Sequence, residues 1–143
     1  MKIRMEQEEN QIVQICQEFA KKADQLEVKG CNDLDYKENG FIEDFNKLFS
    51  QYCYGKQNRT HSGLNFRQPP RYSNVAYAKR EIIEKKSKTR YQVTFEKEPK
   101  IGSIRFIIDK KHGSWKIIRF ETFLGVANQR KTEAEEIWRK HRL

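Results

Sequence analysis

The spacing of apolar residues changes about halfway along the chain, from a helical period to the two-residue period of a strand, and this change constrains the fold more than any other feature. Between Glu6 and Val28, apolar residues recur every three or four positions, as on one face of an amphipathic helix: Ile12, Cys16, Phe19, Ala20, Ala23 and Leu26. Gly30 is expected to end this helix. A second helix, with a broad aromatic face, is expected from Phe41 to Cys53 and to end at Gly55.

The two-residue period begins after a stretch that fits neither helix nor strand. Pro69 and Pro70 exclude a helix there, so residues 64–73 are expected to form a structured loop. Four strands are predicted beyond it, at Asn74–Lys86, Arg90–Lys97, Ser103–Asp109 and Trp115–Phe123. A hairpin turn over Lys110–Ser114 is expected to join the last two strands.

The last of these strands changes its alternation partway along. Trp115 and Ile117 share one parity, whereas Ile118 and Phe120 share the other. Either both sides of this strand are covered, or a β-bulge shifts the pattern by one residue.

Residues 126–143 are expected to form a C-terminal helical extension. Thr132 and Glu135 have the T-x-x-E spacing of a capping box, and Ile137 and Trp138 follow as its apolar residues. The basic end of the chain would then complement the negative pole of a short helix.

The order of elements predicts an α+β fold, with N-terminal helices packed on one side of a curved antiparallel sheet. A chain of 143 residues fits one domain, and residues 1–143 are expected to form it. Aromatic residues make up 12% of the chain, which argues against disorder even though only 36% is hydrophobic. Without an apolar run of roughly 20 residues or a signal peptide, we expect a soluble, cytoplasmic protein that does not contact membranes.

The net charge of +9 is concentrated in the second half of the chain. Residues 1–60 hold nine basic and eleven acidic side chains, whereas residues 61–143 hold twenty and nine. Such a charge favours an anionic partner, whether nucleic acid, an acidic protein or a lipid surface. The alternative is that these Lys and Arg residues form the solvated side of a half-buried sheet.

Signatures of catalysis and of metal binding are missing from the sequence. There is neither a G-x-S-x-G elbow nor a glycine-rich phosphate loop, and the carboxylate pairs Asp33/Asp35 and Glu135/Glu136 have polar surroundings that favour solvated or capping roles. The cysteines and histidines lack metal-ligand spacing: Cys16, Cys31, Cys53, His61, His112 and His141. We therefore expect a protein that is not an enzyme and that needs no metal or cofactor.

A nucleic-acid-binding role has some support in the basic stretch from Lys85 to Arg90. Single-strand binders place exposed aromatic rings beside such charges. The aromatic residues nearby have the parity of core residues, however, which disfavours this role: Tyr91, Phe95, Phe106 and Trp115.

Taken together, several features resemble bacterial immunity proteins of the nuclear transport factor 2-like fold, which belong to polymorphic toxin systems. They are the two helices, the Pro-Pro-Arg-Tyr loop at Pro69–Tyr72, the D-K-K-H-G-S-W-K-I hairpin at Asp109–Ile117, and Trp138 and Leu143 near the end. The resemblance is strongest between Gly63 and Trp115. It implies a cone-shaped domain, similar also to cystatins, that binds and neutralises a cognate secreted toxin without catalysing a reaction.

The candidate partner-binding residues are expected on the outer face of the sheet or on the hairpin rims: Arg71, Tyr72, Lys110, Lys111 and Arg119. Because the chain is basic, the toxin is expected to present an acidic surface. An exposed sheet also allows a homodimer. The alternatives are a basic nucleic-acid-binding domain, or a small-molecule pocket or enzyme site on the same fold, near Tyr77, Tyr91 and Trp115.

Overall fold

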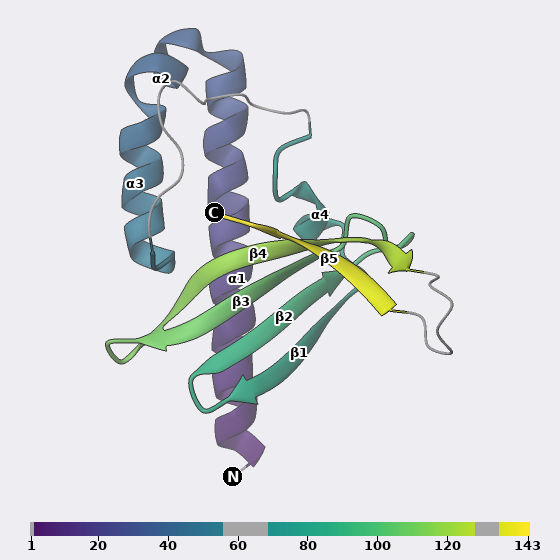
Figure 1. Ribbon diagram of the computed structural model, residues 1–143. Coiled ribbons are helices and arrows are strands. Elements are labelled where there is room, and N and C mark those ends of the chain that lie inside the picture. The colour runs from purple at the N-terminus through teal and green to yellow at the C-terminus, as the bar shows by residue number, and fades with distance from the viewer. Residues whose placement is uncertain (1, 56–68, 128–134) are drawn as a thin grey trace.

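The computed structural model describes residues 2–55, 69–127 and 135–143, which form an α+β fold (Figure 1). Its helices are α1 (Lys2–Asn32), α2 (Leu34–Asn39), α3 (Phe41–Tyr52) and α4 (Ser73–Ala76). Its strands are β1 (Arg80–Ser87), β2 (Arg90–Glu96), β3 (Ile104–Lys111), β4 (Ser114–Ala127) and β5 (Glu135–His141). The predicted combination of N-terminal helices with an antiparallel sheet is therefore confirmed.

Helix α1 buries the predicted apolar face against the sheet, and Ile12, Cys16 and Phe19 are fully buried. The expected end at Gly30 is wrong, because Gly30 is buried within the last turn and the helix continues to Asn32. The chain turns instead at Asp33, whose carboxylate accepts a hydrogen bond of 3.1 Å from the Tyr36 amide and so caps the short helix α2.

Helix α3 lies beside α1 and buries its aromatic face against it, with Phe45 edge-on to Phe19 at 6.5 Å between ring centroids. It ends at Tyr52, earlier than predicted, because Cys53 is extended and pairs with Ile117 through an isolated parallel β-bridge. The chain therefore leaves the helix along the edge of β4.

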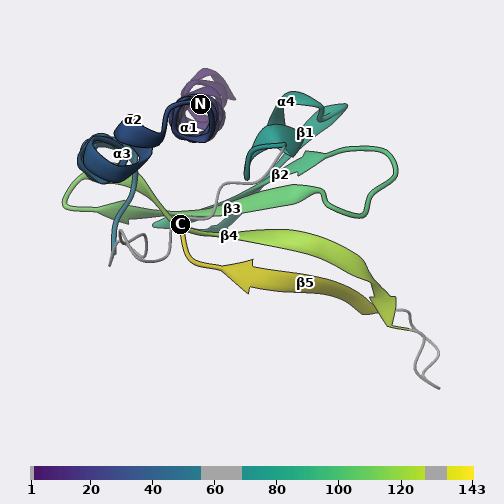
Figure 2. The ribbon, with the colours of Figure 1, turned by 90° about the horizontal axis from the view of Figure 1, so that it is seen from above.

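The sheet is an open antiparallel meander in the order β1-β2-β3-β4-β5, and α1, α2 and α3 all lie on one side of it (Figure 2). We call this side the inner face and the opposite side the outer face. Three predicted strands are confirmed as β2, β3 and β4. The strand predicted from Asn74 is wrong in its first part, because Ser73–Ala76 forms a turn of helix and β1 begins only at Arg80. Residues 64–68 of the predicted loop lie outside the described residues.

A β-bulge in β4 resolves the change of alternation. Ile107 pairs with Arg119 and Ile108 pairs with Ile117, so Ile118 is an extra residue opposite β3. As a result, Ile117 and Phe120 are both buried on the inner face, and Arg119 points to the outer face.

The predicted C-terminal helix is wrong: residues 135–141 form strand β5, which pairs with β4 from Phe120–His141 to Ala127–Glu135. Thr132, the first residue of the supposed capping box, lies outside the described residues. Strand β4 is longer than β3, and its free edge offers backbone hydrogen bonds that a helix could not satisfy. The contact of Trp138 with Phe123, 5.2 Å between ring centroids, also favours the strand.

Candidate functional site

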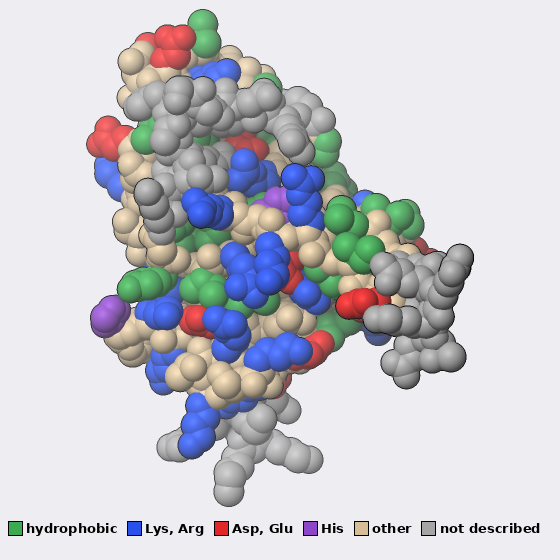
Figure 3. Space-filling view, viewed as in Figure 1, with side chains coloured by type: hydrophobic (Ala, Val, Ile, Leu, Met, Phe, Trp, Pro, Cys, Tyr) green, Lys and Arg blue, Asp and Glu red, His purple; other side chains and the backbone are tan. Residues whose placement is uncertain are grey.

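The outer face carries a group of charged residues on β2 to β5 that we call the basic patch. It consists of the cations Arg90, Arg105, Lys111, Arg119 and Lys140 and the carboxylates Asp109 and Glu121. Strand register brings them together, since Arg90 pairs with Asp109, Arg105 with Glu121, and Glu121 with Lys140. Figure 3, which looks onto this face, shows Lys and Arg side chains gathered near its centre.

Glu121 is the best-defined member of the patch, because it is only 2% exposed and holds two arginines. Its Oε1 accepts a hydrogen bond from Nε of Arg105, and its Oε2 accepts one of 3.0 Å from Nε of Arg119. Burial raises the pKa of the Glu121 carboxyl, but the hydrogen bonds and the positive charges of the two guanidinium groups together outweigh burial, and the pKa lies below its usual value. Glu121 is therefore charged at neutral pH and fixes both arginine side chains.

Arg105 is held from a second side by Trp138. The guanidinium carbon lies 4.1 Å from the centroid of the indole ring, a cation–π contact, and the same ring packs against Phe123. Strand β5 thus contributes directly to the patch through Trp138 and Lys140.

Asp109 makes a second, similar arrangement next to the first. Arg90 donates two hydrogen bonds to its carboxylate, of 2.6 and 2.9 Å, and these keep the pKa of Asp109 below its usual value. Lys111 lies 4.0 Å from the same carboxylate and 5.2 Å from the centroid of the Tyr54 ring. Asp109 is only 8% exposed.

The charge that the basic patch presents to solvent is therefore positive. Its five cations outnumber its two carboxylates, and both carboxylates are nearly buried beneath the side chains that they bind. The β1 side of the same face differs: the pairs Arg80–Glu96 and Lys86–Glu84 are balanced in charge. Among the described residues, the excess positive charge of the outer face therefore lies on the β2 to β5 side rather than at these β1 pairs.

The predicted partner-binding residues do not lie together. Lys111 and Arg119 belong to the basic patch, whereas Lys110 points to the inner side of the hairpin, with Nζ 5.8 Å from the Trp115 ring. Arg71 is exposed and lies beside the C-terminus, because its Nη1 donates a hydrogen bond of 3.4 Å to the backbone oxygen of Leu143.

Tyr72 requires a correction, because its side chain is 1% exposed and lies in the core. Its ring contacts those of Phe19, Phe106 and Phe120, which come from α1, β3 and β4. The loop before α4 therefore inserts Tyr72 between the helices and the sheet, out of reach of a partner.

Sequence reasoning missed Arg90, Arg105, Asp109, Glu121 and Lys140 as members of the patch. Arg90, Arg105 and Asp109 have the outward parity of strands that were predicted, so alternation alone could have placed them on one face. Glu121 follows the change of alternation in its strand, so the side on which it lies depends on the bulge at Ile118. Lys140 could not be found in this way, since its strand was expected to be a helix.

The three predicted pocket residues are also separated. Tyr91 and Trp115 pack edge-on at 5.1 Å, and the Tyr91 hydroxyl donates a hydrogen bond of 2.6 Å to Glu8. Burial raises the pKa of Tyr91, and the hydrogen bond to Glu8 raises it further. The two rings therefore belong to the packed inner face, whereas Tyr77 is 74% exposed elsewhere.

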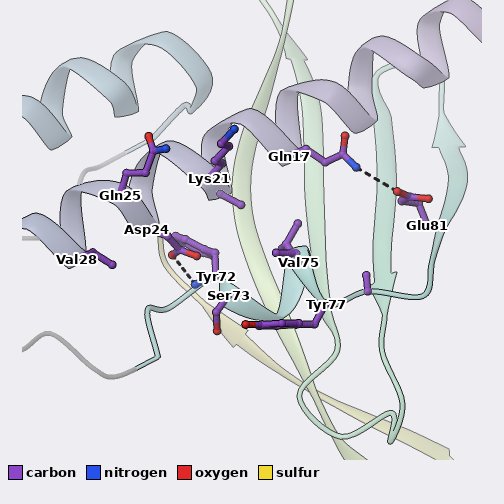
Figure 4. A pocket seen from close by; sticks show the side chains of 13 residues that line it. Gln17, Lys21, Asp24, Gln25, Val28, Tyr72, Ser73, Val75, Tyr77 and Glu81 are labelled. Atoms are coloured by element: carbon purple, nitrogen blue, oxygen red, sulfur yellow. Dashed lines mark hydrogen bonds between the residues drawn. The ribbon is translucent and has the colours of Figure 1, made fainter.

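Tyr77 lines an open groove of about 700 Å³ between α1 and the segment 72–78 (Figure 4). Two hydrogen bonds join polar groups of the groove wall: Gln17 donates one of 3.1 Å to Glu81, and Asp24 accepts one of 2.9 Å from the Tyr72 amide. Both carboxylates therefore have structural partners within the groove wall.

Neither a metal site nor a membrane span emerges from the described parts of the chain. Among these residues, no three His, Cys, Asp or Glu side chains are grouped so as to hold a metal ion. None of the described helices is both long and apolar enough to cross a membrane.

Comparisons with known proteins do not place the chain in a family. It matches no protein-family model, and neither a curated protein nor a solved structure matches it. The class to which the protein can be assigned is therefore the one that its own fold defines: an α+β protein whose open five-stranded antiparallel sheet is covered by helices on one face.

Proposed function

We propose that this protein is a non-catalytic immunity protein, which binds an acidic surface of a cognate secreted bacterial toxin and thereby neutralises it. The observation that carries the proposal is the basic patch, a set of cations on the outer face whose carboxylates are nearly buried. The arrangement of helices on an antiparallel sheet is compatible with the nuclear transport factor 2-like fold that the sequence resemblance implies.

The outer face suits protein recognition for two reasons. The described helices α1, α2 and α3 lie on the inner face, so none of them covers the middle of the outer face. Arginines that are already fixed in place lose little conformational entropy on binding, and arginine is enriched among the residues that dominate interface energies. A positive surface also accelerates encounter with an acidic partner.

Binding of single-stranded nucleic acid is less well supported by the same face. Such binding relies on aromatic rings that are open for base stacking. The ring of Trp138, beside Glu121 and Arg105, is covered by the Arg105 guanidinium, and the Lys111 ammonium lies over the ring of Tyr54 at the edge of the patch. A carboxylate-bearing protein surface needs no stacking platform.

Co-expression tests the proposal. Toxin genes that neighbour this gene are expressed in a sensitive bacterial host, with and without the protein, and survival is measured. We expect the wild-type protein to restore growth and to co-purify with one of these toxins. Unchanged killing by every neighbouring toxin, in the presence of folded protein, would contradict the proposal.

A pair of matched variants then tests whether the toxin binds to the basic patch. Arg119→Glu reverses a charge within the patch, whereas Arg80→Glu reverses one on the balanced β1 side; both arginines donate Nε to a glutamate, at 3.0 and 3.1 Å. We expect Arg119→Glu to abolish protection and Arg80→Glu to preserve it. Equal protection by both variants would exclude the basic patch as the toxin-binding surface.

A further inference from the structure

We infer that Arg105, Arg119 and Lys140, arranged around Glu121, form a preformed receptor for a carboxylate side chain, so that the partner inserts an Asp or Glu at this point. The inference rests on the proposed function in that it names the group that the toxin must present. The chemistry itself can be tested without any toxin.

The two arginines retain the donors that a carboxylate needs. Each uses its Nε to bind Glu121, and in the described part of the chain the Nη atoms of Arg105 and Arg119 make no hydrogen bond. Guanidinium groups pair with carboxylates through parallel N–H donors, and such charge-assisted bonds are stronger than neutral ones. The side chains are 21% and 33% exposed, so their outward donors remain accessible.

Lys140 completes the receptor from the neighbouring strand. It lies directly opposite Glu121 in the β4–β5 register and is exposed. No ion pair involves it within the described ranges. With Glu121 occupied by the arginines, the ammonium group supplies a further cation for a second anionic oxygen.

Glu121 acts as a positioning residue. Its buried carboxylate fixes both guanidinium groups before a partner arrives, and Trp138 restricts Arg105 further. A free pair of arginines would repel each other and would lose side-chain entropy on binding. The fixed negative charge therefore favours binding of another negative group, by orienting the cations that receive it.

The first experiment measures binding of a labelled oligoglutamate peptide by fluorescence anisotropy at low salt, beside a single-stranded RNA of equal charge. The variants Arg119→Gln and Arg80→Gln each remove one charge from an arginine bonded to a glutamate. We expect Arg119→Gln to weaken peptide binding about tenfold, as the loss of a charge-assisted hydrogen bond predicts, and Arg80→Gln to leave it within about twofold. Circular dichroism confirms that both variants are folded.

The positioning role is tested by Glu121→Gln, which makes the protein more positive. If the cluster acted through charge alone, this variant would bind the peptide more tightly. We expect weaker binding, because the arginines are no longer held. Should the variant fail to fold, Trp138→Phe tests the same role by loosening the contact with Arg105.

The outcomes separate this inference from the proposed function. The inference of a carboxylate receptor is overturned if Arg119→Gln and Arg80→Gln weaken peptide binding equally. It is also overturned if the wild-type protein binds RNA more tightly than the peptide. Retained toxin protection by Arg119→Gln, with peptide binding lost, also overturns the inference but leaves the immunity function standing. Selective peptide binding without neutralisation of any toxin would instead remove the immunity function and retain the carboxylate site.

Discussion

The ring of Tyr72 meets the ring of Phe120 edge-on, with 5.0 Å between their centroids, and thereby ties the loop before α4 to the middle of β4. The segment 69–72 has no regular structure, yet it supplies one of the largest fully buried side chains. The loop is thus a structural part of the core.

We expect Tyr72→Ala to lower the free energy of unfolding by about 3–5 kcal/mol, because it removes a buried aromatic ring and leaves a cavity between helices and sheet. Tyr77→Ala serves as the control, since its side chain is 74% exposed and should cost no more than about 0.5 kcal/mol. Urea denaturation followed by circular dichroism measures both. Similar stability of the two variants would contradict the assignment of Tyr72 to the core.

Stability should fall at acidic pH as Glu121 becomes protonated. Its pKa in the folded protein lies below the usual value of 4.5, so its contribution is present above that value and is lost as the pH falls through the folded pKa. We expect Glu121→Gln to cost about 1–2 kcal/mol at neutral pH and to show a flatter pH dependence below about pH 4.5. Glu43→Gln, which removes the charge of an exposed glutamate paired with Lys47, should lose stability at acidic pH in the same way as the wild-type protein.

The β3–β4 hairpin depends on two residues with positive φ, His112 at 51° and Gly113 at 82°, as in a type I′ turn. We expect Gly113→Ala to destabilise the protein by about 1 kcal/mol through backbone strain alone, because no atom lies within 4 Å of the added methyl group. His112→Asn should be neutral or stabilising, since asparagine tolerates this conformation better. Thermal unfolding of the two variants tests the turn; a stabilising Gly113→Ala would refute it.

The cysteines should differ sharply in reactivity. Cys31 is exposed, whereas Cys16 and Cys53 are buried, and burial raises the pKa of both buried thiols. Because the thiolate is the reactive form, we expect one thiol to react quickly with a disulfide reagent and two to react only on unfolding. Cys31→Ser should remove the fast phase of the reaction with the disulfide reagent and leave the slow reaction of Cys16 and Cys53 unchanged.

The C-terminal strand can be examined through Trp138. Its contacts with Phe123 and Arg105 predict that Trp138→Ala costs about 2 kcal/mol and accelerates amide hydrogen exchange in residues 135–141 more than in β1. Ile137→Ala is the control, because this side chain is 42% exposed. An exchange pattern typical of a helix over these residues would contradict the strand.

Much of the fold follows from local patterns that tertiary structure did not override. The apolar residues of α1 and the aromatic residues of α3 each lie on one side of their helix, so the sequence indicates which side of each helix is buried. In β2 and β3 the alternation is regular, and it correctly places Tyr91 and Phe106 in the core. The same alternation contains the outward patch residues Arg90, Arg105 and Asp109, although their register across strands could not be read from it.

The errors arise where distant contacts decide local structure. The T-x-x-E pattern before Ile137 favours a helix locally, but the long free edge of β4 recruits this segment as a strand. Tyr72 follows two prolines in a stretch without period, so nothing in its neighbourhood reveals that its ring enters the core. The carboxylate receptor depends on both β4 and β5 and was therefore hidden from a residue-by-residue reading.

Ile118 has a consequence for how β4 tolerates change in length. As the extra residue of the bulge, it separates two stretches that would otherwise alternate in step. Deletion of Ile118 would leave Ile117 on the inner face and Arg119 on the outer face, in regular alternation. A deletion within the paired residues Arg119–Phe123 would instead move the side chains of part of the strand to the opposite face of the sheet. The bulge at Ile118 is thus a position of β4 where shortening the chain preserves the surface chemistry of the sheet opposite β3, and Leu124 is a corresponding extra residue opposite β5.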